Sequence, residues 1–130
     1  MLKNAILSAA VMLSSASAFA EFKGLGCLGT EPFWSLDVDV VKSKMTYTSP
    51  DNLKGSAYKM SQPSQAVGLQ ENMVMVFKAA KKDVSATVIS SDLAGKKCSD
   101  GMSENEYSFH VVYRNGANVV YGCCEPKAQD

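Results

Sequence analysis

The sequence has no excess charge of either sign, because 13 lysine and arginine residues balance 13 aspartate and glutamate residues. A nucleic-acid-binding domain carries a basic patch or a high pI, so this balance argues against a nucleic-acid partner. No apolar run approaches about 18 residues, so we predict no transmembrane segment. Histidine occurs once, as His110, and no Gly-x-Ser-x-Gly elbow is present. We therefore predict no catalytic residue, no cofactor and no metal site.

The first 20 residues have the pattern of a secretory signal peptide. Lys3 precedes an apolar stretch from Ala5 to Leu13, and small residues stand at Ala18 and Ala20. The alternative interpretation is an N-terminal helix of the folded domain. We predict cleavage after Ala20, one mature domain over residues 21–130, and export to the periplasm or the exterior.

All four cysteines follow this segment: Cys27, Cys98, Cys123 and Cys124. An even number of cysteines in an exported chain favours two disulfides over a metal or redox site. A bond between the neighbours Cys123 and Cys124 would close a strained ring, so two pairings remain. Cys27 pairs either with Cys123 or with Cys124, and Cys98 takes the other. Adjacent residues of a strand point to opposite faces, so the two neighbours should serve partners on two sides of a sheet.

Short segments of alternating apolar and polar residues follow one another along the mature sequence. They are typical of half-buried strands, and they span 33–41, 44–49, 56–60, 84–90, 106–113 and 118–123. A further segment, 72–79, is apolar on both sides, as expected for a central strand. Asn115-Gly116 predicts a tight hairpin between the last two. Residues 91–105 lack strand periodicity and should form a loop tied down by Cys98. Seven or eight strands and no helix predict an all-β fold: a small antiparallel β-barrel, stapled by disulfides, or alternatively a β-sandwich.

Two motifs near the ends of the mature chain resemble those of a bacterial family. One is Gly29-Thr30-Glu31-Pro32-Phe33-Trp34; the other is Cys98-Ser99-Asp100-Gly101-Met102-Ser103, followed by Tyr107 and later by Gly122-Cys123-Cys124. Together they resemble a family of small, uncharacterised bacterial envelope proteins, often lipoproteins, with a G-[TN]-E-P-F-W opening and a C-x-D-G-M-S-x-x-x-Y segment. The resemblance implies an envelope location and a small β fold, and it implies no reaction. Ser108 stands where the family has proline, and no lipid-attachment cysteine is evident after the signal.

The two motifs also supply the candidate ligand-binding residues: Glu31, Phe33, Trp34, Asp100, Met102 and Ser103. A disulfide from Cys98 to the last strand would bring the second motif to one end of the barrel. Trp34 should anchor the core at one end of the barrel. The alternative is a ligand platform at the barrel mouth, with Phe33 exposed on the opposite face. The residues from 100 to 103 should form a turn. The Glu31 carboxylate should accept hydrogen bonds from the backbone N–H groups of this turn.

These observations favour an exported, non-enzymatic envelope protein that binds or inhibits an unknown protein or binds a small ligand. Small exported barrels that inhibit lysozymes offer an analogy of fold and compartment. One alternative is periplasmic copper or zinc binding through Met73, Met75, His110 or the cysteines. The other is an enzyme that uses Glu31 and Asp100 as two close carboxylates with raised pKa values. His110 alone is expected to be a half-exposed surface residue.

Overall fold

The computed structural model describes residues 22–81 and 83–128. The predicted signal peptide and its predicted cleavage site lie outside this range. Nine strands form one antiparallel sheet in the order β4-β3-β2-β1-β11-β10-β7-β6-β5. Their bounds are β1 Gly24–Thr30, β2 Phe33–Asp39, β3 Lys44–Ser49, β4 Asn52–Lys59, β5 Ser64–Gln65, β6 Val74–Lys78, β7 Val84–Ser90, β10 Phe109–Asn115 and β11 Asn118–Pro126. Between β7 and β10 come a one-turn helix, α1 (Ser91–Ala94), and a separate strand pair, β8 (Cys98–Ser99) with β9 (Glu106–Tyr107).

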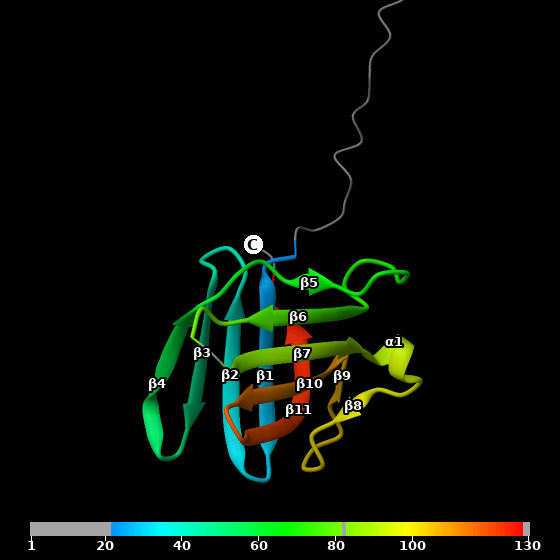
Figure 1. The fold of residues 1–130 in the computed structure, drawn as a ribbon. Helices are drawn as coiled ribbons and strands as arrows, with labels where there is room; N and C mark the ends of the chain where they lie inside the picture. The colour runs from blue at the N-terminus through cyan, green and yellow to red at the C-terminus, as the bar shows by residue number, and fades with distance from the viewer. Residues whose placement is uncertain (1–21, 82, 129–130) are drawn as a thin grey trace, which may run out of the picture.

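The sheet curls over itself into a half-barrel. In Figure 1, strands β1 to β4 stand upright in the view, each antiparallel to its neighbour, and β5, β6, β7 and β10 lie across them. Strand β11 connects these two groups of strands, because its residues Asn118–Cys124 pair with β10 and its residues Cys123–Pro126 pair with β1. A bridge between Met60 and Ala79 joins the two outer parts of the sheet at one end. The prediction of a small antiparallel all-β fold with a barrel-like sheet is confirmed.

The inner face carries the core, and the alternation predicted for β2 is observed. Trp34, Leu36 and Val38 are buried, and their neighbours on the strand face outward. The Trp34 ring stacks on Tyr47 and Tyr113 at centroid distances of 5.9 and 6.4 Å. Trp34 is therefore a core anchor, as predicted.

Glycines let this indole ring lie against the backbone of β1 and β11. A Cβ atom added at Gly29 would overlap the Trp34 ring, and one at Gly122 would overlap both that ring and the Leu28 carbonyl. Gly29 and Gly122 belong to the two motifs of the sequence. Packing against Trp34 thus explains why each motif has glycine at these two positions.

Several elements differ from the sequence prediction. Strand β1 was not predicted, because three of its seven residues are glycine and leave little apolar alternation. The last hairpin turns one residue later than expected: Asn115 pairs with Asn118, so Gly116 and Ala117 form the loop. Gly116 has φ of +61°, which suits the first loop position of a type II′ turn. The segment expected to be a loop contains helix α1, and the Ser90 side chain caps it by accepting a hydrogen bond from the Asp92 N–H group.

The disulfides are Cys27–Cys124 and Cys98–Cys123. Cys124 belongs to the inner core, whereas Cys123 faces outward and meets Cys98 of β8. The predicted division between two faces is confirmed, and the structure selects one of the two pairings. Two disulfides fit an oxidising, extracytoplasmic compartment. No helix in the described part of the chain is long and apolar enough to cross a membrane.

Candidate functional site

The 98–107 segment is fastened to the outer face of the sheet. The Cys98–Cys123 disulfide joins it to β11, and the Thr30 hydroxyl of β1 donates a hydrogen bond to the Asp100 carbonyl oxygen at 2.7 Å. Cys98 also pairs with Tyr107, which closes the segment into a small hairpin. Two strands that are neighbours in the sheet, β1 and β11, therefore hold the segment in place.

The Asp100 carboxylate organises the tip of this segment. Its Oδ1 atom accepts the N–H groups of Met102 and Ser103 at 2.9 and 2.8 Å. Its Oδ2 atom accepts the hydroxyl groups of Ser103 and Tyr107 at 2.7 and 3.0 Å. These bonds, led by the Met102 amide, lower the pKa of Asp100 to about 2, and the same carboxylate raises the pKa of Tyr107. Asp100 is thus an ionised turn former, and its pKa is lowered where an acid–base enzyme would need it raised.

The expected role of Glu31 is wrong. Glu31 is exposed in the turn between β1 and β2, and the amides of Met102 and Ser103 bind Asp100 instead. An aspartate side chain reaches amides two and three residues ahead without any long-range contact, so it outcompetes a distant carboxylate. Glu31 lines a hollow of about 220 Å³ with Ser99, Asp100 and Tyr121.

An apolar groove opens beside this segment, on the outer face of β1, β2 and β3. We call it the outer groove. It has a volume of about 460 Å³ and is lined by Leu28, Gly29, Thr30, Phe33, Trp34, Ser35, Thr48, Ser49, Pro50, Asp100 and Met102. Phe33 is 56% exposed and Met102 is 67% exposed, so two large apolar side chains face solvent at one site.

The structure brings four of the six predicted residues to this groove: Phe33, Trp34, Asp100 and Met102. Ser103 supports Asp100 from outside the lining, and Glu31 lies in the neighbouring hollow. Sequence reasoning missed Leu28 and Thr48, which lie in one cross-strand row with Ser35. The available signal was the short connection from Thr30 to Phe33, which folds β1 onto β2 and sets this register.

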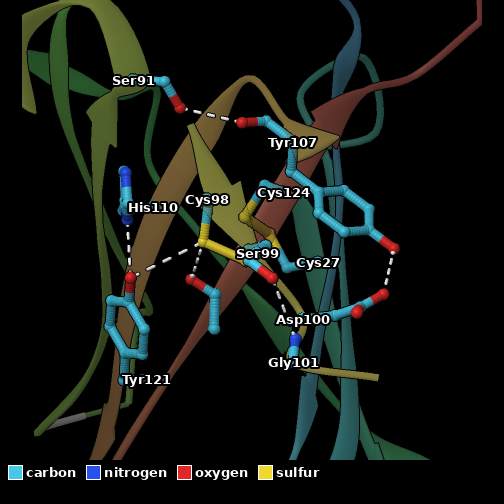
Figure 2. Close-up of a disulfide and its surroundings, with 12 residues drawn as sticks. Cys27, Ser91, Cys98, Ser99, Asp100, Gly101, Tyr107, His110, Tyr121 and Cys124 are labelled. Atoms are coloured by element: carbon cyan, nitrogen blue, oxygen red, sulfur yellow. Dashed lines mark hydrogen bonds between the residues drawn. A yellow bond between two sulfur atoms is a disulfide. The ribbon is translucent and has the colours of Figure 1, made fainter. Parts of the chain in front are cut away.

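His110 is 8% exposed, which corrects the expectation of a half-exposed residue. Its Nε2 atom lies 3.0 Å from the Lys96 carbonyl oxygen, which only accepts, so Nε2 carries a proton. In the neutral ring, Nδ1 then accepts the Tyr121 hydroxyl at 2.6 Å. Figure 2 shows this hydroxyl between His110 and the Cys98 sulfur, 3.6 Å from the latter. His110 is buried because the segment after β7 lies against the face of β10 from which its side chain projects. The alternation of residues within β10 does not predict this contact.

The side chains named for a copper or zinc site do not converge. All four cysteines are in disulfides, and both nitrogens of His110 have protein partners. Met75 is fully buried in the core, and Met73 precedes strand β6. Within residues 22–81 and 83–128, no group of three or more His, Cys, Asp or Glu side chains could hold a metal ion.

The chain matches no protein-family model, no curated protein and no solved structure. Its exposed lining is apolar, and its one carboxylate is occupied by hydrogen bonds within its own turn. This chemistry suits contact with an apolar group.

Proposed function

We propose that the protein is an exported, non-enzymatic binding module of the cell envelope. Its outer groove receives an apolar side chain presented by a partner protein. The observation that carries the proposal is the joint exposure of Phe33 and Met102 on one groove. The signal-peptide pattern, the two disulfides and the family resemblance support export.

The exposure of two large apolar side chains, Phe33 and Met102, to solvent at the outer groove favours a binding function. Removing apolar surface from water contributes roughly 25 cal/mol per Å² in favour of a complex, before the entropic cost of association is subtracted. Aromatic residues and methionine are enriched at the centres of protein interfaces. Phe33 and Met102 stand more than half exposed at the rim of the groove, so a partner's surface can cover them.

The groove is also pre-organised. Its floor is the outer face of β1 to β3, where Leu28, Ser35 and Thr48 are cross-strand neighbours. Its wall is the 98–107 segment, held by the Cys98–Cys123 disulfide and by the hydrogen bond from Thr30. A site that is already ordered loses less conformational entropy on binding, which favours a tighter complex.

Site-specific photo-crosslinking in cells that export the protein tests this proposal. The photoreactive residue p-benzoylphenylalanine replaces Phe33, which keeps an aromatic ring at the groove. The control carries it in place of Leu53, which is 79% exposed on β4, outside the groove lining. We expect a discrete protein adduct at position 33 and none at position 53.

Competition with purified protein checks that the adduct reports on the groove. Excess wild-type protein and the Leu53→Ser variant should both suppress the adduct, and Phe33→Ser should not. Identical adducts at both positions, or none at position 33, would overturn the proposal. An adduct to a small molecule would replace the protein partner with a small ligand.

Export itself is tested by intact mass, which should show a mature start at Glu21 and the loss of four thiol hydrogens.

A further inference from the structure

Met102 is much more exposed than the other methionines of the described residues. It is 67% exposed, whereas Met45 and Met75 are fully buried and Met60 is 6% exposed. Met73 is half-buried. An oxidant in solution therefore meets the Met102 thioether first, because susceptibility to oxidation follows exposure.

The cysteines offer an oxidant no competing target. All four are in disulfides, so no thiol is available to react first. The same compartment that keeps these disulfides oxidised exposes the thioether to oxidants. Met102 is thus the most accessible oxidisable sulfur in the described residues.

We infer that Met102 is an oxidation site at which a peroxide switches off the outer groove. One oxygen atom of hydrogen peroxide is transferred to the Met102 Sδ atom: the S–O bond forms, the O–O bond breaks and water leaves. Sulfur is oxidised by two electrons, and the peroxide is reduced by two. The reaction needs no other group of the protein, and sulfoxide reductases reverse it.

The sulfoxide changes the groove because Met102 stays in place. The amide of Met102 donates to Asp100, and the disulfide of Cys98 holds the segment, so the oxidised side chain remains at the groove. A sulfoxide is polar, and covering it with an apolar partner group carries a desolvation cost. The loss of binding rests on the proposed function; the selective oxidation does not.

Peptide mapping of the folded, disulfide-bonded protein tests the selectivity. After timed exposure to hydrogen peroxide, the protein is quenched, reduced, alkylated and cut with trypsin. Residues 98–114 then form a peptide whose only methionine is Met102, and residues 45–54 form one whose only methionine is Met45. We expect the first peptide to gain an oxygen atom at least about tenfold faster than the second. Similar rates would overturn the oxidation site.

The crosslinking assay at position 33 tests the switch. Peroxide should lower the adduct yield of the otherwise unchanged protein at least about threefold. The yield of Met102→Leu should be the same before and after peroxide, whatever its starting value, because leucine cannot be oxidised. Met102→Gln should lower the yield without peroxide. An unchanged yield from protein oxidised at Met102 would overturn the switch and leave the groove's function standing. Absence of an adduct before oxidation would overturn both, while the peptide map still decides the oxidation site.

Discussion

The two disulfides leave opposite faces of strand β11 and support different kinds of structure. Cys27 and Cys124 are direct neighbours across the β1–β11 ladder, and their bond lies in the core. Cys123 instead bonds on the outer face to Cys98, in a segment whose only regular structure is a pair of two-residue strands. The inner bond therefore reinforces a contact that backbone hydrogen bonds already define. The outer bond attaches this segment, which is one wall of the outer groove, to the sheet.

Removing the inner disulfide should lower the stability of the protein more than any other change considered below. Replacing Cys27 and Cys124 together by alanine opens a loop spanning 97 positions. The free energy of unfolding should fall by roughly 4–5 kcal/mol in the chain-entropy model. Urea unfolding of the purified variant measures this loss. Hydrogen exchange of the Met102 and Ser103 amides below the unfolding transition should stay as slow as in the wild type, because their turn is on the other face.

The outer bond should show the reverse pattern. Replacing Cys98 and Cys123 by alanine opens a span of 25 positions, so the loss of stability should be roughly 3–4 kcal/mol. The amides of Met102 and Ser103 should now exchange faster, and the crosslink from position 33 should weaken. If this variant lost more global stability than the inner one, or kept full amide protection, the comparison would fail.

Asp100→Asn tests the turn that the outer bond positions. The pKa of Asp100 is about 2 in the folded protein and 3.8 ordinarily, because the Met102 amide and its neighbours stabilise the carboxylate. Its contribution to stability is therefore fully present above pH 3.8 and is lost as the pH falls through about 2. Urea midpoints measured from pH 5 to pH 2 should fall more steeply for the wild type than for Asp100→Asn. Asp51→Asn, another exposed aspartate variant, should keep the wild-type slope.

Thr30→Val should have the smallest effect. Valine keeps the β-branched shape in β1 and removes one hydrogen bond, from the Thr30 hydroxyl to the Asp100 carbonyl. The expected loss is about 1 kcal/mol, and it should appear as faster amide exchange in the 98–107 segment. Thr48→Val is the matched control, because Thr48 lines the same groove without a hydrogen bond to that segment. Equal exchange rates in the two variants would show that the bond from Thr30 does not hold the segment.

Much of the fold follows from local pattern. The alternation of β2 predicts that Trp34 faces the core and Phe33 faces solvent, and both are observed. Strand β1 was missed because glycines at positions 24, 26 and 29 remove the pattern that marks a strand. The glycine at position 29 is needed by the Trp34 ring, a contact made only after β1 and β2 pair.

The candidate site was predictable only in part. Two motifs identified Phe33, Asp100 and Met102, but the pairing of β1, β2 and β3 that places Leu28 and Thr48 beside them was not predicted. His110 was misjudged because its cover comes from the segment that follows β7. In each case the missing information was a contact between residues far apart along the chain.

The sequence by itself determined which side chains share a face, because a strand repeats every two residues. That rule alone sends Cys123 and Cys124 to opposite faces and separates Phe33 from Trp34. Only the tertiary structure decided which cysteine each of them meets. It also decided that Thr30 and Asp100, 70 positions apart, would join at the outer groove. Strand pairing and loop attachment depend on such distant contacts, and no local repeat encodes them.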